Sequence, residues 1–166
     1  MIFFLVLLTV LMLTVIITDT TRYIIPNWLV AVLFVFYPVF LYCAPGHIEW
    51  QIALLFALGT FAVGFGLFAA NIMGAGDIKL LTAAALWTGK SAFPTFIMGV
   101  GLFGGLLALV LVVARPFTAF MFSKLQHPPA IPRVLTVGEP VPYGVAIALI
   151  FLLLLWKSDI PGLVLH

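Results

Sequence analysis

The sequence predicts an all-α, polytopic membrane protein: a bundle of about six transmembrane helices forming one domain over residues 1–166. The composition is 65% hydrophobic and only 7% charged, whereas a soluble domain has about 25% charged residues. The apolar residues also fall in runs long enough to cross a hydrocarbon core of about 30 Å. Because so few polar side chains could cover the surface in water, we expect lipid to surround the chain.

The first predicted span, Met1–Thr18, is an apolar run interrupted only by threonines. It lacks a basic region and a small-residue cleavage site, so we expect a retained span rather than a cleaved signal peptide. A turn is predicted after this span, because Pro26 disfavours helix at the residue before the proline. The second span, Trp28–Ala44, begins with a tryptophan suited to the membrane interface.

The third and fourth predicted spans flank a glycine-rich stretch. Trp50–Ala70 is the third, and small residues recur there at every fourth position, which lets another helix approach closely. Ile78–Thr88 is the fourth and is too short to cross a membrane unless it begins near Met73. We therefore predict a short fourth helix that the glycine-rich stretch opens.

The last third of the chain contains two further predicted spans, Ala92–Ala114 and Pro142–Trp156. Between them, Arg115–Val141 carries three cations and five prolines, which predicts an irregular surface loop. Within this loop, Phe117–Leu125 could form a short interfacial helix. The sequence leaves open whether the loop gates entry to a site.

The basic residues predict an orientation. Loops after the first, third and fifth spans hold five of the seven Lys and Arg residues: Arg22, Lys79, Arg115, Lys124 and Arg133. The positive-inside rule places these loops in the cytoplasm, which predicts a multi-pass protein of the inner (cytoplasmic) membrane. The formal net charge of +2 is too small, and the cations too scattered, to indicate nucleic-acid binding.

Asp19 and Asp77 are the candidate catalytic residues, because ionisable groups beside membrane spans are costly and indicate function. The predicted orientation places both on the cytoplasmic side. Two carboxyl groups within hydrogen-bonding reach titrate as a unit, so one is charged while the other keeps its proton. The charged member can take a proton from water, and the neutral member can donate to a substrate carbonyl. Alternatively, both acids are ordinary solvated residues at span ends.

The neighbours of the two acids fit an extended peptide between them. Gly74 and Gly76 allow positive φ and close approach of another backbone. Lys79 would not face the second acid on a helix, so we expect its side chain to extend to lipid headgroups. Arg22 follows Asp19 by three residues and could pair with it if the helix continues.

Three motifs carry a family resemblance. Asp19 is followed by Ile25-Pro26-Asn27, a second motif reads Gly74-Ala75-Gly76-Asp77-Ile78-Lys79-Leu80, and Pro142-Tyr143-Gly144 opens the last predicted span. In these motifs, and in the number and order of spans, the chain resembles the type IV prepilin peptidases. It is most similar to the small forms that accompany tight-adherence (Flp-type) pili.

The resemblance implies a single membrane peptidase domain in which Asp19 and Asp77 are the catalytic pair of an aspartyl endopeptidase. It implies supporting or substrate-binding roles for the other motif residues and nearby cations: Gly74, Gly76, Lys79, Arg22, Pro26 and Asn27. The implied substrate is a prepilin, with a short charged leader, a cleavage point after a small residue and a hydrophobic helix.

Larger, bifunctional members of that family carry an additional cytoplasmic segment with paired cysteines and also methylate the new N-terminus. This chain starts directly with a span and has one cysteine, Cys43. We therefore expect no methyl transfer, no S-adenosylmethionine, no zinc and no other cofactor. The particular pilin and the oligomeric state are not predicted.

Two functions other than proteolysis remain open from the sequence. A transporter or channel would use the acids as a proton or cation relay, which predicts carboxylates near the middle of the membrane. A non-catalytic pilus or secretion assembly protein would tolerate loss of either acid. Gly89-Lys90-Ser91 lacks the first glycine of a phosphate-binding loop, since Ala84 stands there. Polar loop roles are expected for His47, His127, His166 and Glu49, whereas Glu139 could also touch the leader peptide.

Overall fold

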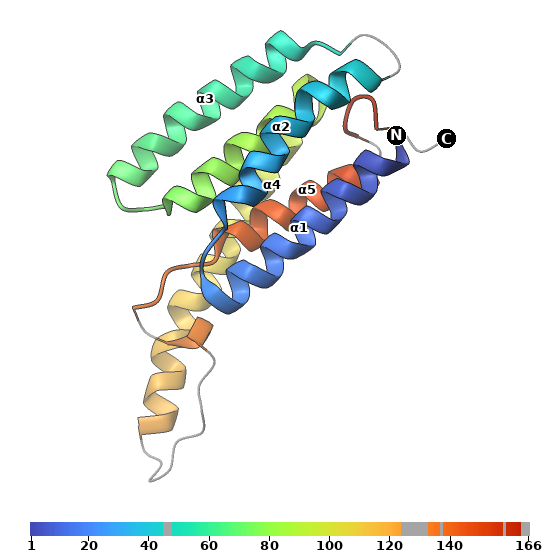
Figure 1. Cartoon of the computed structure of the whole chain (residues 1–166). Helices are drawn as coiled ribbons and strands as arrows, with labels where there is room; N and C mark the ends of the chain where they lie inside the picture. Colours follow the sequence, from blue (N-terminus) through green and yellow to red (C-terminus); the bar gives the residue numbers. More distant parts are fainter. Residues whose placement is uncertain (45–47, 124–132, 137, 158, 164–166) are drawn as a thin grey trace.

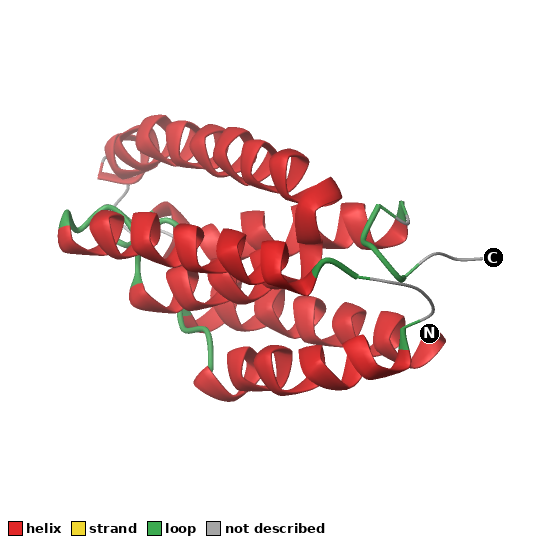
Figure 2. Ribbon diagram, turned by 90° about the horizontal axis from the view of Figure 1, so that it is seen from above, coloured by secondary structure: helices red, strands yellow, loops and turns green. Residues whose placement is uncertain are grey.

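The computed structural model contains five α-helices and one 3₁₀ turn over the residues it describes: 1–44, 48–123, 133–136, 138–157 and 159–163. The helices run side by side, and the described residues include no strand (Figures 1 and 2). The elements are α1 (Ile2–Arg22), α2 (Asn27–Cys43), α3 (Trp50–Ala69), α4 (Ala75–Ser123), the 3₁₀ turn η1 (Arg133–Leu135) and α5 (Tyr143–Trp156). The predicted all-α class is confirmed.

Among the described residues, three helices are long and apolar enough to cross a membrane. They are Ile2–Arg22, Trp50–Ala69 and Ala75–Phe122, while the remaining two, α2 and α5, are shorter apolar helices. Many large apolar side chains on the outer faces are exposed, for example Leu102 at 74% and Val63 at 68%. Such exposure is costly in water and favourable in lipid, so it agrees with the predicted membrane protein.

The predicted fourth and fifth spans are two segments of one element, α4. They meet at Gly89, whose φ of 58° and ψ of −166° are not helical. A positive φ combined with a ψ near 180° is adopted almost only by glycine, so a kink can form here between two apolar segments. Over the described residues the structure therefore has five α-helices, and the predicted count of about six is not confirmed.

The predicted loop Arg115–Val141 was wrong at its start. Helix α4 continues to Ser123 and passes through Pro116. Proline removes one backbone donor, but a long apolar helix tolerates it where neighbours satisfy the freed group. Of the predicted interfacial helix Phe117–Leu125, the part up to Ser123 is the end of α4, and the remainder lies outside the described residues.

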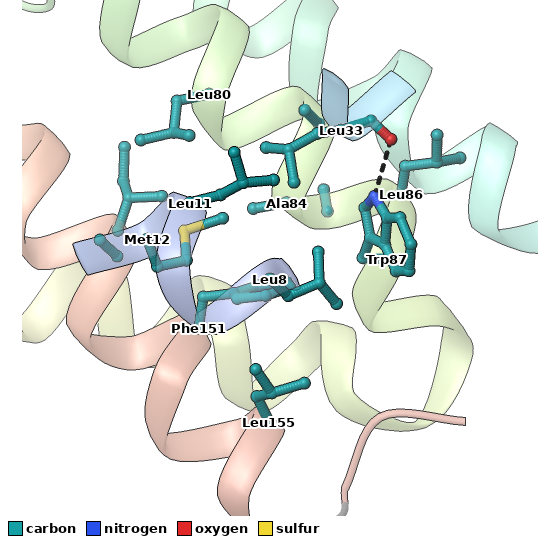
Figure 3. Close-up of a cluster of buried hydrophobic side chains, with 14 of the residues drawn as sticks. Leu8, Leu11, Met12, Leu33, Leu80, Ala84, Leu86, Trp87, Phe151 and Leu155 are labelled. Atoms are coloured by element: carbon teal, nitrogen blue, oxygen red, sulfur yellow. Dashed lines mark hydrogen bonds between the residues drawn. The ribbon is translucent and has the colours of Figure 1, made fainter. Parts of the chain in front are cut away.

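A buried cluster of apolar side chains joins α1, α2, α4 and α5 (Figure 3). Trp87 of α4 belongs to this cluster and is 2% exposed, and its indole N–H donates to the backbone carbonyl of Leu33 in α2 at 3.0 Å. A buried indole N–H needs such a partner. Leu8 and Met12 of α1 and Phe151 of α5 are fully buried in the same cluster. This packing brings the C-terminal end of α1 to the N-terminal ends of α4 and α5.

Candidate active site

A cavity of about 730 Å³ lies where these three helix ends meet. Its volume falls within the range of about 300–1,000 Å³ that is typical of ligand sites. Its wall includes Asp19, Asp77, Asn27, Lys79, Gly74 and Gly76. Two acids that lie far apart in the sequence therefore face one cavity, together with four of the six predicted supporting residues.

Asp77 is held by its own helix. Helix α4 begins at Ala75, so Asp77 lies in the first turn, and its carboxylate accepts a hydrogen bond from the backbone of Gly74. A side chain in the first turn that reaches back to the residue before the helix satisfies a backbone donor that the helix leaves free. A β-carbon on Gly74 would lie 3.1 Å from Asp77 Oδ2, so the missing side chain leaves room for this contact.

Asp19 lies near the C-terminal end of its helix, whereas Asp77 lies near the N-terminal end of α4. Asp19 is in the last turn of α1, which ends at Tyr23 in a left-handed conformation, and it is 4% exposed. Carboxylates are destabilised near a helix C-terminus and stabilised near an N-terminus. The free N–H groups at the start of α5 supply that stabilisation, because Val145 N–H donates to Asp19 Oδ2 at 3.1 Å and the Gly144 backbone contributes a further hydrogen bond.

Gly144 joins the two acids. Its backbone hydrogen-bonds the carboxylates of both Asp19 and Asp77, and the two carboxyl groups interact electrostatically. A β-carbon on Gly144 would lie 2.8 Å from Asp19 Oδ2 and 2.8 Å from Ile25 Cδ1. The sequence marked Pro142-Tyr143-Gly144 only as a motif, and its contact with the acids was not predicted.

Two supporting residues of the first two motifs, Asn27 and Lys79, line the cavity and are joined by a hydrogen bond. Lys79 Nζ donates to Asn27 Oδ1 at 3.2 Å. Pro26 precedes α2 in an extended conformation, with φ of −61° and ψ of 133°, and so places Asn27 at the helix start. Lys79 is exposed, but its amine is directed to Asn27 rather than only to lipid headgroups as predicted.

Two details of the predicted site differ in the structure. Arg22 is exposed, and no ion pair between described residues joins it to Asp19, whose carboxylate is turned toward α5. Gly74 and Gly76 do not adopt positive φ. Their contribution is the missing side chain, since a β-carbon on Gly76 would lie 3.4 Å from Ile25.

Arg115 is buried, whereas the sequence predicts it to be a cation of a surface loop. It is 9% exposed, and its guanidinium donates to the carbonyls of Val134 at 3.1 Å, Glu139 at 2.6 Å and Pro140 at 2.9 Å. These bonds tie the segment before α5 to α4, and Pro140 and Val141 of that segment line the cavity. A cation directly after an apolar run was a usable signal for this role.

The acids of the cavity are not accompanied by a metal-binding group. Among the described residues, no three His, Cys, Asp or Glu side chains gather closely enough to hold a metal ion. The three histidines that were predicted to be polar loop residues, His47, His127 and His166, lie outside the described residues. The cavity presents two carboxyl groups, the side chains of Asn27 and Lys79, and the backbone of two glycines.

Comparison with protein families identifies the family of the chain. A family model described as the type IV leader peptidase family matches residues 6–109, more than half of the chain. The matched region contains both Asp19 and Asp77 and ends within α4. Neither the curated proteins nor the solved structures include a match to the chain.

Proposed function

The chain belongs to the type IV leader peptidase family, and we propose that it is a membrane aspartyl endopeptidase. In this proposal it removes the leader of Flp-like type IV prepilins at the cytoplasmic face of the inner membrane. The observation that carries the proposal is the meeting of Asp19 and Asp77 in one cavity, with the backbone of Gly144 bonded to both. Two adjacent carboxyl groups that share one proton are the machinery of aspartic proteolysis.

The proposed reaction uses only these acids and water. The charged carboxylate removes a proton from water while the water oxygen attacks the scissile carbonyl carbon. The neutral carboxylic acid gives its proton to the carbonyl oxygen, which produces a neutral gem-diol. One carboxyl group then gives its proton to the amide nitrogen, and a carboxylate of the pair removes a proton from a gem-diol hydroxyl, so the C–N bond breaks and a carboxylic acid and an amine are released. The pair ends with one proton and is ready for the next cycle.

The wall of the cavity suits an extended peptide. Gly74 and Gly76 present backbone without side chains next to Asp77. A peptide must be extended for its scissile bond to lie between two acids, and a glycine wall lets its backbone come close. The Lys79–Asn27 bridge lies at the same cavity and would contact the leader side of the substrate.

A proton or cation relay fits the geometry less well. Such a function predicts acids along a path through the middle of the membrane. Asp19 instead lies in the last turn of α1 and Asp77 in the first turn of α4. Both therefore lie at helix ends, where an extended substrate can reach them from the aqueous side.

The test is cleavage of a co-expressed prepilin in cells that lack another prepilin peptidase. We expect Asp19→Asn and Asp77→Asn each to reduce cleavage by at least about 100-fold, the lower range for acid–base catalysis. The double variant should lose no more than either single variant, because groups that act as a unit are not additive. Mass spectrometry of the mature product should place the new N-terminus at the junction of leader and hydrophobic helix.

The matched control is Asp159→Asn. Asp159 is an exposed acid outside the cavity, and its variant should cleave like the wild type. Membrane insertion and thermal unfolding in detergent should be compared for all variants. Continued processing by either correctly inserted single variant would remove that acid from the mechanism and would favour a non-catalytic assembly role.

A further inference from the structure

A second, apolar groove adjoins the cavity of the two acids. It has a volume of about 410 Å³ and lies between α3 and the second segment of α4, with Tyr143 of α5 at one end. Ile72, Met73 and Tyr143 line both this groove and the cavity of Asp19 and Asp77. An occupant of the groove can therefore continue directly into the candidate active site.

The groove wall contains glycines whose open side contacts nothing else in the bundle. A β-carbon on Gly59, Gly101 or Gly105 would meet no atom within 4 Å. Other glycines of the same helices are covered: a β-carbon on Gly64 would lie 2.7 Å from Ile78, and one on Gly104 would lie 3.1 Å from Tyr143. The covered glycines thus serve packing within the chain, whereas the open ones leave room for something outside it.

The dimensions of the groove suit an α-helix. Its α3 wall runs from Gly59 to Leu67, about 12 Å at 1.5 Å per residue, and its α4 wall from Phe93 to Gly105, about 18 Å. These lengths correspond to two or three helical turns. Small residues four apart, such as Gly101 and Gly105, let the backbone of another helix approach closely in lipid.

The two ends of the groove differ. At the end near the starts of α3 and of the second α4 segment, the rings of Phe56 and Phe93 stack with centroids 4.3 Å apart. At the other end lie Ile72 and Met73, directly before the stretch that carries Gly74 and Asp77. A helix in the groove would therefore have one end against the stacked rings and the other at the acids.

We propose that this groove binds the hydrophobic helix of the prepilin substrate and presents the residues that precede it to Asp19 and Asp77. The inference rests on the proposed peptidase function. A lipid chain could fill the same apolar space, but it has no backbone that continues into the neighbouring cavity. A substrate helix can pack its own small residues against Gly59 and Gly101 and fill the apolar groove. The residues that precede this helix can then enter the adjoining polar cavity.

The first experiment fills the groove. Gly59→Leu and Gly101→Leu should each reduce cleavage of the membrane-inserted prepilin at least tenfold. Both should still cleave a short soluble peptide that contains only the leader junction, because that peptide has no helix to dock. Asp77→Asn should lose both activities, so failure of the groove proposal and failure of the peptidase proposal give different results.

The matched control is Gly66→Leu. A β-carbon on Gly66 also meets no atom within 4 Å, but Gly66 is not part of the groove wall. Its leucine variant should therefore process the prepilin like the wild type. Unchanged prepilin processing by Gly59→Leu and Gly101→Leu would overturn the proposal and leave lipid as the occupant.

The second experiment locates the substrate helix directly. In a Cys43→Ser background with Asp77→Asn, Val63→Cys should form disulfides with single cysteines along one face of the prepilin helix, at spacings of three and four residues. Val113→Cys, whose native side chain is 64% exposed outside the groove, is the control and should form few. Equal cross-linking at both positions, or cross-linking only between copies of the peptidase, would contradict docking of the substrate in the groove.

Discussion

The last turn of α1 and the first turn of α4 each present an aspartate to the same cavity, but they hold it by different means. Asp77 is held locally, because its carboxylate accepts a hydrogen bond from Gly74, three residues earlier. Asp19 is held by Val145, which is 126 residues away in the sequence. The carboxylate of Asp77 therefore has a partner directly before its own helix in addition to Gly144, whereas the partners of the Asp19 carboxylate, Gly144 and Val145, both come from α5.

Helix electrostatics explain this division. Asp77 lies at a helix N-terminus, where the free backbone N–H groups stabilise a negative charge. Asp19 lies near the C-terminus of α1, where its own helix offers only carbonyls, so it needs the N-terminus of another helix. We therefore expect substitutions around α5 to affect the site more than substitutions around Gly74.

The largest effect in this comparison is expected for Gly144→Ala. The added β-carbon would lie 2.8 Å from both Asp19 Oδ2 and Ile25 Cδ1, which forces α5 away from α1. We expect kcat for prepilin cleavage to fall at least about tenfold, equivalent to about 1.4 kcal/mol of activation free energy, with a smaller change in KM. Steady-state cleavage by purified protein in detergent measures both constants.

Gly66→Ala controls for the general effect of adding a methyl group to a helix. A β-carbon there meets no atom within 4 Å. Its kcat should remain within about twofold of the wild type, since alanine favours helix over glycine. Equal activities of Gly144→Ala and Gly66→Ala would show that α5 does not position Asp19.

An intermediate effect is expected for Arg115→Met. Methionine replaces the aliphatic stem of the arginine but removes all three hydrogen bonds to the segment before α5. These bonds are partly buried, and a hydrogen bond to a charged group contributes about 1.5–3 kcal/mol. We expect a lower temperature of thermal unfolding and a several-fold loss of cleavage, because the position of α5 becomes less defined. Thermal unfolding in detergent and cleavage assays measure the two effects.

Lys90→Met is the matched control for loss of a cation. Lys90 and Glu49 form an exposed ion pair at 3.6 Å, with side chains 63% and 53% exposed. Exposed pairs contribute about 0–1 kcal/mol, so this variant should unfold and cleave nearly like the wild type. A loss in Lys90→Met as large as that in Arg115→Met would argue against a specific role of the buried guanidinium.

The smallest effect is expected for Gly74→Ala. The added β-carbon would lie 3.1 Å from Asp77 Oδ2, so the carboxylate must shift by a few tenths of an ångström, but the backbone donor at residue 74 is retained. We expect a loss of only about two- to threefold in kcat, close to about 0.5 kcal/mol. If Gly74→Ala lowered kcat more than Gly144→Ala does, the local contact of Asp77 would matter more than the contacts from α5, contrary to the proposal.

Sequence patterns predicted where most helices lie, but they did not predict where α4 kinks or ends. The apolar runs predicted helices near their observed places, because burial in lipid favours helices whose backbone groups are satisfied within the segment. Pro26 correctly predicted the turn between α1 and α2. Pro116 did not end a helix, and Gly89 changed the direction of one, since the effect of a single proline or glycine depends on what packs against it.

The same limit applies to the candidate site. Asp19 and Asp77 were predicted from their scarcity, their motifs and their places at span ends, whereas the buried role of Arg115 and the contact of Gly144 with both acids were not. These contacts join residues that no local pattern connects. The predicted pairing of Arg22 with Asp19 failed for the same reason, because the partner of Asp19 comes from α5.

The sequence by itself determined that this chain forms apolar helices, and it determined which two acids lie at their ends. Apolar run length, helix propensity and glycine or proline position are local properties that can be identified without a fold. Only the tertiary structure decided that α5 completes the site and that an open groove leads into it. Both depend on how closely helix backbones pack, and that distance is determined by side chains from several helices at once.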